Sequence, residues 1–348
     1  MAEEMIGTPF VGKEREELVE FLKEQGLDYD ENISYSIVLR EDGKIIATGS
    51  CHQNILKCIA VAKECQGRNL LAPVLSNLTA HFFETGITHF FGFTKPKNKV
   101  IFTKMGLYPI AETGHVLLLE NKKDGIKKYL DALQKETQMQ METGQENQKK
   151  TQIGSIVANC NPFTKGHRYL IEEAAKQCKW LHLFILSEEQ SDFTTAERWK
   201  MVLDGIYDIP NVILHHTSDY LISPVVFPTY FMKEKEKAYQ MNCELDIEIF
   251  TSLIAPGLQI DCRYVGCEPD CEVTRAYNGC LKELLPSHKI QVYELERLKI
   301  HGETVSASKV RAAWKKGMLE DADEMIPEST RQILEEIYER KYGKRSNA

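Results

Sequence analysis

The sequence lacks the features that mark several large classes of protein. It has no basic tail, and 43 Lys and Arg are outnumbered by 51 Asp and Glu, giving a net charge of −8. This balance argues against a nucleic-acid binder, which neutralises phosphates. No run approaches the ~18 apolar residues of a membrane span, and the acidic start lacks the apolar core of a signal peptide. The ten Cys form no CxxC pair, so we expect reduced thiols in a cytoplasmic protein.

Two common nucleotide-binding fingerprints are also missing. No GxGxxG dinucleotide motif is present. The stretch Gly7–Lys13 reads GxxxxGK, but Glu14 stands where a P-loop has Ser or Thr, so the magnesium-binding hydroxyl is lost. Too few residues precede Gly7 for a strand to be expected there. A P-loop is therefore not predicted.

The length of 348 residues is about twice that of a usual single domain. A segment dominated by Lys, Gln and Glu, residues 121–150, interrupts the apolar pattern. We therefore predict one domain at residues 1–120, a polar linker at 121–150 and a second domain at 151–348. The first domain mixes hairpin strands with helices at 16–25 and 70–85, which indicates an α+β fold.

The second domain alternates strands and helices. Short apolar runs, typical of strands buried on both faces, occur at 154–160, 180–186, 212–215, 263–266 and 290–295. Alternation of this kind predicts an α/β domain with a Rossmann-like parallel sheet, and its ligands are expected at the carboxyl ends of the strands.

The first candidate site is the sequence Asn161-Pro-Phe-Thr-Lys-Gly-His167, between a predicted strand and a predicted helix. Thr164 suits the N-cap, and Gly166 permits close backbone approach. Free N–H groups and the helix dipole at this end favour an anion such as phosphate. His167 opens the helix and is expected to lean over the bound phosphate.

A second candidate site is Val305-Ser-Ala-Ser-Lys-Val-Arg311, just before a predicted helix at 309–316. Two hydroxyls, of Ser306 and Ser308, and two cations, of Lys309 and Arg311, suit phosphate oxygens at a helix N-terminus. Glu268 and Arg275 follow another strand end and could also line the site. Four nearby Cys fit no zinc spacing, so no metal site is predicted.

The pair TxGH and SxSKVR resembles the signatures of the nucleotidylyltransferase superfamily, related to HIGH and KMSKS of class I aminoacyl-tRNA synthetases. Three longer segments narrow the resemblance to the citrate lyase ligase family, over nearly all of residues 151–345. They are Ala158-Asn-Cys-Asn-Pro-Phe-Thr-Lys-Gly-His-Arg-Tyr-Leu170, Ser223-Pro-Val-Val-Phe-Pro-Thr-Tyr-Phe231 and Val265-Gly-Cys-Glu-Pro-Asp-Cys-Glu-Val-Thr-Arg-Ala-Tyr-Asn278.

This resemblance implies an ATP-dependent ligase, with Mg²⁺ accompanying ATP. It would adenylate acetate and then acetylate the CoA-like thiol group of the citrate lyase acyl carrier subunit, releasing AMP and pyrophosphate. His167 and Lys309 would be catalytic, with Lys309 and Arg311 on the β- and γ-phosphates. The remaining ATP-binding residues would be Asn161, Phe163, Thr164, Gly166, Ser306 and Ser308, the two serines also capping their helix.

The first domain resembles the GNAT acyltransferases, through residues 61–72 and the segment from Thr94 to Tyr108. The GNAT pyrophosphate loop corresponds to residues 66–71, where Asn69 and Leu71 replace the expected small residues. Asn tolerates left-handed backbone, but Leu71 hinders close approach of a pyrophosphate. We therefore expect this domain to guide the carrier's prosthetic arm. Two alternatives stay open: an adenylyltransferase acting on a nucleotide or pantetheine phosphate, and a CoA-binding regulatory module.

Overall fold

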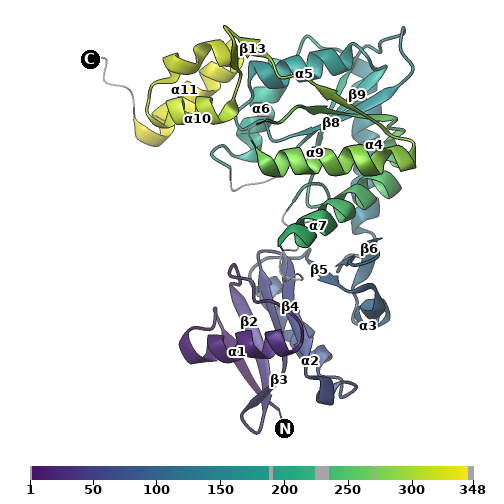
Figure 1. Ribbon diagram of the computed structural model, residues 1–348, viewed down its shortest axis with the longest axis vertical. Coiled ribbons are helices and arrows are strands. Elements are labelled where there is room, and N and C mark those ends of the chain that lie inside the picture. The colour runs from purple at the N-terminus through teal and green to yellow at the C-terminus, as the bar shows by residue number, and fades with distance from the viewer. Residues whose placement is uncertain (1, 188–190, 224–234, 270, 344–348) are drawn as a thin grey trace. The chain divides into compact units, whose positions relative to one another are not determined.

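The computed structural model divides the chain into two compact units, and each is described by itself. The structure describes residues 2–187, 191–223, 235–269 and 271–343 (Figure 1). The first unit comprises Met1–Tyr129 and Pro224–Ile249, and the second comprises Leu130–Ser223 and Phe250–Ala348. The boundaries expected at 120 and 151 thus differ from this division, and a segment of the second half returns to the first unit.

The first unit is built on a seven-stranded sheet in the order β1-β2-β3-β4-β5-β7-β6. Neighbouring strands run antiparallel, except β4 and β5, which are parallel. The strands are β1 (Glu3–Gly7), β2 (Tyr35–Glu41), β3 (Lys44–His52), β4 (Ile55–Val61), β5 (Phe91–Thr94), β6 (Tyr108–Glu112) and β7 (Leu117–Glu120). With its helices, this sheet forms the α+β fold that the sequence predicts.

In the described part of the chain, the helices that accompany this sheet are α1 (Gly12–Glu24), α2 (Leu71–Glu84), α3 (Lys99–Lys104) and α7 (Lys235–Ile249), the last packed on β6. α1 and α2 each bury an apolar stripe, Leu18, Phe21 and Leu22 on α1 and Val74, Leu75, Leu78 and Phe82 on α2. Short 3-10 turns lie at Lys63–Cys65 and Pro96–Asn98.

The loop between β4 and α2 has the backbone that its sequence suggested. β4 and β5 pair only at Ile55 with Phe91 and at Leu56 with Gly92. Beyond these pairs, the chain leaves β4 through a loop in which Asn69 has φ +57. This value lies in the left-handed region, which Asn adopts more readily than most residues, so the expectation for Asn69 is confirmed.

The GxxxxGK stretch lies on a strand and a helix after all. β1 ends at Gly7 and α1 begins at Gly12, so the expectation that no strand precedes Gly7 was wrong. β1 is nevertheless an edge strand paired antiparallel to β2. A P-loop instead follows a strand of a parallel sheet, and its absence from this stretch rests on Glu14 as well as on this pairing.

The second unit is built on a five-stranded parallel sheet in the order β10-β9-β8-β11-β12. Its strands are β8 (Ile153–Ala158), β9 (Trp180–Ile185), β10 (Val212–His216), β11 (Cys262–Gly266) and β12 (Gln291–Leu295). Each overlaps a strand that the sequence predicts, so the Rossmann-like parallel sheet is confirmed. From the first strand, β8, the order proceeds to both sides, which puts the switch point between β8 and β11.

Helices surround this sheet (Figure 1). They are α4 (Gly125–Thr143), α5 (Lys165–Ala175), α6 (Thr195–Gly205), α8 (Ala255–Leu258), α9 (Glu272–Leu284), α10 (Ala307–Lys315) and α11 (Glu328–Tyr342). A π-helical turn, Phe250–Ile254, precedes α8, 3-10 turns lie at Leu285–His288 and Leu319–Met325, and β13 (Lys299–Ile300) pairs with β14 (Glu303–Thr304). Buried side chains of α5, α6, α10 and α11 share one core with the sheet.

The expected polar linker is mostly helix, a correction to the sequence prediction. α4 covers Gly125–Thr143, and the boundary between the units falls within it, after Tyr129. Its second half packs on the second unit, where Leu133 is 1% exposed. The Gln140 amide bonds both the N–H and the C=O of Leu214, at 2.8 and 2.9 Å, and so satisfies part of the edge strand β10. The buried Leu133 and these polar contacts together hold the helix.

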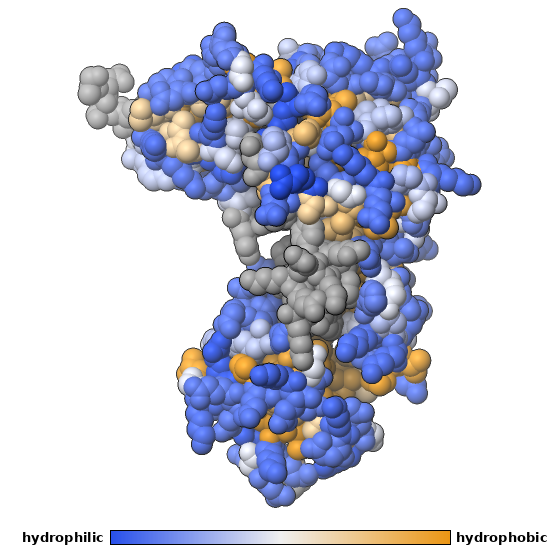
Figure 2. All heavy atoms as spheres, in the orientation of Figure 1, coloured by the Kyte–Doolittle hydropathy of each residue, from blue (hydrophilic) through white to orange (hydrophobic). Residues whose placement is uncertain are grey.

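The surfaces of the units are mainly hydrophilic, with scattered hydrophobic side chains (Figure 2). Among the described residues, no helix combines the length and the apolar character that crossing a bilayer requires. All ten Cys are free thiols, and seven of them are buried. The seven buried thiols pack in the cores as small apolar side chains.

Leu133→Ala should test whether α4 is a packed part of the second unit. Removing a leucine that is 1% exposed leaves a cavity, and we expect the free energy of unfolding of this unit to fall by about 2–5 kcal/mol. Lys135→Ala, at an exposed position of the same helix, is the matched control. Thermal melting of both variants is the measurement. Equal melting temperatures would mean that α4 is a dispensable linker.

Candidate functional site

The two motifs meet at the carboxyl edge of the parallel sheet. β8 ends at Ala158, and the loop after it leads into α5, which begins at Lys165. This loop lies next to the switch point, where ligands of open α/β sheets bind. The chain therefore presents the N-terminus of an 11-residue helix at the position where phosphate groups are usually held.

Thr164 and His167 form a reciprocal capping box at the start of α5. The hydroxyl of Thr164 accepts the His167 backbone N–H at 3.3 Å, and the Thr164 backbone N–H donates to His167 Nδ1 at 3.1 Å. Thr164 is thus the N-cap that the sequence predicts. Because Nδ1 accepts, the proton of the neutral ring lies on Nε2. The cap therefore fixes both the orientation and the tautomer of His167.

His167 is neutral over the physiological range. Burial, with the positive charges of Arg297 and Arg311, lowers its pKa to about 4. Burial disfavours the charged ring, and two nearby cations disfavour it further. A ring in this state donates one neutral hydrogen bond through Nε2 and does not act as an ionised group near pH 7.

Arg311 joins the second motif to the first. Its guanidinium donates to the backbone carbonyl of Asn161 through NH1 and to the hydroxyl of Ser308 through NH2, the latter at 3.2 Å. Gly166 of the first motif also lies close to Val305 of the second motif, because a Cβ added to Gly166 would be 3.4 Å from Val305 Cγ1. The structure thus brings together the two motifs that are about 140 residues apart in the sequence.

The cations of the second motif are neutralised by carboxylates of the chain. Lys309 Nζ lies 2.9 Å from Glu303 Oε2, and both side chains are exposed. Arg311 Nε lies 3.2 Å from Asp192 Oδ2, whose other oxygen is 2.5 Å from Lys315 Nζ. Exposed pairs of this kind contribute little stability and exchange readily with another anion. A polyphosphate could therefore take the place of Glu303 on Lys309.

Three residues of the motifs, Phe163, Ser306 and Ser308, differ from their expected roles. The Phe163 side chain is fully buried in the core of the second unit, where it packs on Gly205, so any contact with a ligand is limited to its backbone. Ser306 occupies the N-cap position of α10 but its side chain makes no capping bond, and Ser308 bonds Arg311 instead. The expectation that these serines cap the helix was wrong.

Glu268 lies beside Arg297, which the sequence did not suggest as a site residue. The carboxylate of Glu268 accepts from NH2 of Arg297 and from the Cys271 backbone N–H, and Arg297 Nε donates to the Cys267 carbonyl at 2.9 Å. Of the two positive charges that lower the pKa of His167, Arg297 has the larger effect. Arg297 follows the end of β12 by two residues, so it lies at the same carboxyl edge of the sheet. That position was the one signal in the sequence that could have identified it as a site residue.

Arg275 does not join this group in the described part of the chain. It is exposed, and its NH1 donates to the Pro269 carbonyl at 3.3 Å. The segment from Ser223 to Phe231, which carries part of the family resemblance, lies almost wholly outside the described residues, as does Asp270.

A buried arginine supports the loop after β8. Arg198 of α6 is fully buried and donates to both the carbonyl and the side-chain oxygen of Asn159, at 2.8 and 2.9 Å. It also bonds the Phe193 carbonyl at 3.2 Å. The sequence showed Arg198 only as part of a helix that starts at a Thr194–Glu197 capping box, which the structure confirms. Nothing in the pattern indicated its contact with the loop.

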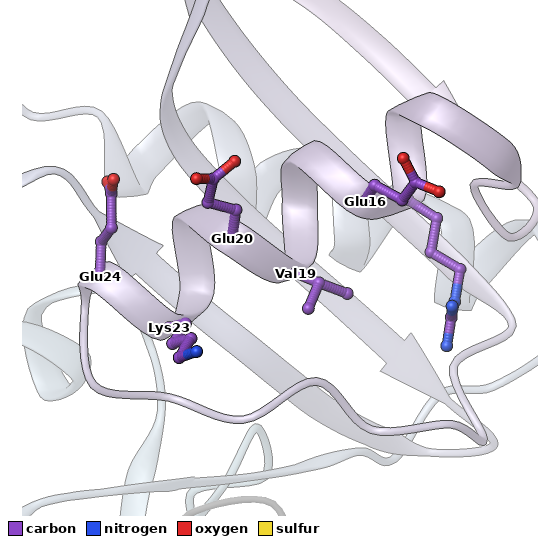
Figure 3. A pocket seen from close by; sticks show the side chains of 6 residues that line it. Glu16, Val19, Glu20, Lys23 and Glu24 are labelled. Carbon is purple, nitrogen blue, oxygen red and sulfur yellow. The ribbon is translucent and has the colours of Figure 1, made fainter.

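Two hollows of the described surface lie away from the two motifs. One of about 550 Å³ follows the exposed face of α1, where Glu16, Glu20 and Glu24 project alongside Val19 and Lys23 (Figure 3). A single helix lines it, and its carboxylates would repel phosphate. Another, of about 420 Å³, lies beside α5 at Arg168 and Asp208, which pair at 2.7 Å. Neither includes a residue of the two motifs.

Arg297→Gln should raise the pKa of His167. The substitution removes one of the two cations that oppose protonation of the ring and leaves the Glu268 carboxylate without its partner charge, and both changes favour the imidazolium. An NMR titration of the ring protons measures this shift. Arg275→Gln is the matched control and should leave the midpoint unchanged. A wild-type midpoint above pH 6 would contradict the burial of this ring.

The model of the family described as "Citrate lyase ligase C-terminal domain" matches residues 153–334. The chain is 36% identical to the "[Citrate [pro-3S]-lyase] ligase" of Klebsiella pneumoniae over 93% of this chain and 94% of the relative. It is 35% identical to the protein of that name from Escherichia coli (strain K12), over 94% and 92%.

A solved acyl-CoA N-acyltransferase from Pseudomonas aeruginosa is similar to 34% of this chain and 97% of its own, at 10% identity and a TM-score of 0.30. The sequence relatives extend over both units. The chain belongs to the citrate lyase ligase family.

Proposed function

We propose that this protein is an AMP-forming acid–thiol ligase that activates citrate lyase. It adenylates acetate with ATP and transfers the acetyl group to the thiol of the prosthetic group on the acyl carrier subunit of citrate lyase. The observation that carries the proposal is the Arg311 contact with Asn161, which places the α5 N-terminus and the cations of the second motif at one sheet edge. The names of the relatives supply citrate lyase as the protein acted on, and the family resemblance of the sequence supplies acetate, ATP and the carrier thiol.

The first step makes acetate reactive. A carboxylate oxygen of acetate attacks the α-phosphorus of ATP, the bond to the bridging oxygen breaks, and pyrophosphate leaves with the electron pair. The product is acetyl-adenylate, in which AMP is a good leaving group. The enzyme contributes alignment and charge neutralisation rather than covalent chemistry. We assign the free N–H groups of α5, beside Thr164 and Gly166, to the α-phosphate.

His167 supplies a neutral donor during this step. The capping box keeps the proton on Nε2, and the low pKa keeps the ring from carrying a charge of its own. A hydrogen bond from Nε2 to a phosphate oxygen strengthens as negative charge grows on the leaving group. Lys309 and Arg311 supply the positive charge on the β- and γ-phosphates, with Lys309 exchanging Glu303 for phosphate.

The second step forms the thioester. The thiolate of the prosthetic group attacks the carbonyl carbon of acetyl-adenylate, and AMP leaves with the electron pair of the broken C–O bond.

Mg²⁺ is expected to arrive with ATP. Within the described part of the chain, no group of three or more His, Cys, Asp or Glu side chains could hold a metal ion, so no protein ligand is assigned. A reaction that uses ATP and a reduced thiol favours a cytoplasmic location.

The first unit is assigned to the carrier rather than to acetyl transfer of its own. Its resemblance to GNAT enzymes favours recognition of a pantetheine arm, whereas Leu71 occupies a position where those enzymes have Gly or Ala. Leu71 is the first residue of α2, so its side chain stands at the helix end that would receive a pyrophosphate. We therefore propose that this unit receives the prosthetic arm.

One incubation separates this function from its rivals. The protein is mixed with ATP, acetate and reduced carrier, and the products are identified by mass spectrometry. The proposal requires AMP, pyrophosphate and acetyl-carrier, all dependent on acetate. A dinucleotide-like product formed without acetate would identify an adenylyltransferase. Binding of CoA with no turnover would identify a regulatory module.

His167→Ala should lower acetate-dependent ATP–pyrophosphate exchange by ~10²–10³-fold, the scale for loss of one preorganised donor to a transition state. His167→Gln places an amide N–H near the position of Nε2 and should recover part of the rate. Melting curves of both variants control for loss of the capping box. Exchange within a few-fold of wild type in His167→Ala would contradict the assignment.

Lys309→Ala should reduce kcat/KM for ATP by ~10–10²-fold, since a hydrogen bond to a charged group contributes about 1.5–3 kcal/mol. The exposed Lys316 lies at the other end of α10, so Lys316→Ala is the control and should leave kcat/KM unchanged. Initial rates of pyrophosphate release measure both. Equal losses in the two variants would indicate a general charge effect rather than contact with the phosphates.

A further inference from the structure

A cationic segment stands out on the first unit of this acidic chain. Residues 94–105 contain four Lys and no Asp or Glu, although acidic residues exceed basic ones in the whole sequence. They form the end of β5, the 3-10 turn Pro96–Asn98 and α3. Lys95, Lys97 and Lys104 are exposed, and the structure gives none of the three a carboxylate partner in the described part of the chain.

The same segment exposes two large apolar side chains. Val100 is 63% exposed and Ile101 is 49% exposed, side by side in the first turn of α3. Phe102, the next residue, is buried and anchors the helix to the unit. Adjacent exposed aliphatic residues rimmed by charges are typical of an interaction surface. We call the set Lys95, Lys97, Val100, Ile101 and Lys104 the α3 patch.

From these observations we infer that the α3 patch docks an acidic, partly apolar protein surface, which under the proposed function is the acyl carrier subunit of citrate lyase. The inference rests on the proposed function for the identity of the partner. The lysines steer and orient the carrier, and the two aliphatic side chains are covered when it binds. Charged rims of this kind act mainly on association and specificity.

A carboxylate-bearing partner fits the patch better than a free phosphate group. Lys99, the one lysine of the segment that is not part of the α3 patch, already forms an ion pair with the Glu112 carboxylate, at 2.7 Å. The side chains of Val100 and Ile101 have no donor or charge with which to bind a phosphate, but they can pack against aliphatic side chains of a partner helix or loop. The lysines are also spread along ten residues in two short elements rather than converging on one point. A small anion would need such convergence.

The test is charge reversal in the full-length enzyme. In K95E/K97E/K104E we expect the KM for carrier to rise at least tenfold, with kcat and acetate-dependent ATP–pyrophosphate exchange within twofold of wild type. The matched control is K13E/K23E/K44E, which reverses three exposed lysines elsewhere in the first unit and changes the net charge equally. Its KM for carrier should stay within twofold. Raising the salt concentration should weaken the wild type more than the patch variant.

Two further measurements complete the test. V100S/I101S keeps every charge and should also raise the KM for carrier, by about threefold or more. Binding of a carrier that lacks its prosthetic group should weaken in K95E/K97E/K104E. If that binding is unchanged while the KM for intact carrier rises, the patch holds phosphates of the arm and the inference fails. Equal effects in both triple variants also overturn it, whereas absent exchange in the wild type would refute the proposed function instead.

Discussion

The site depends on one guanidinium that joins two distant parts of the chain. Arg311 reaches the carbonyl of Asn161 in the loop after β8, the hydroxyl of Ser308 on its own helix and the carboxylate of Asp192. Arginine suits this task because its planar fork carries five donors in fixed directions and never loses its charge. Apolar packing of Val305 beside Gly166 adds to this link between the two motifs.

In this arrangement, different site residues supply the positive charge and the neutral hydrogen-bond donor. Arg311 and Arg297 keep His167 neutral, so positive charge and hydrogen-bond donation come from different side chains. The cations are in turn paired with Asp192, Glu268 and Glu303. An acidic protein can thereby assemble a site for a polyanion without self-repulsion before the ligand binds. Exchange of a carboxylate for a phosphate then costs less than creating a new buried charge.

The sequence predicts those features that local chemistry determines. Apolar runs predicted all five strands of the second unit, and the Thr164 cap followed from its place before Lys165. Features that depend on tertiary contacts were not predictable. α4 carries only a weak apolar stripe in its first half, at Tyr129, Leu130 and Leu133, and is held by Leu133 and by side-chain bonds to β10. Phe163 looked like a ligand contact until its packing on Gly205 was known. Arg297 acts through its position beside two other segments, which no local pattern encodes.

The connectivity of the chain determines how the role of the first unit can be studied. The chain crosses from one unit to the other three times, after Tyr129, after Ser223 and after Ile249. The first unit is therefore not a continuous N-terminal segment. α7 lies late in the sequence but packs on β6, and Glu120, at the end of β7, accepts the Ile126 N–H at the start of α4 at 2.9 Å. A truncation near residue 120 would remove the packing partner of α7 and the capping carboxylate of α4. A loss of carrier acetylation in such a truncated protein could then reflect misfolding, because two helices would lose their supports at once. Point substitutions on the surface of the intact chain avoid this ambiguity, since they change recognition while leaving the three crossings in place.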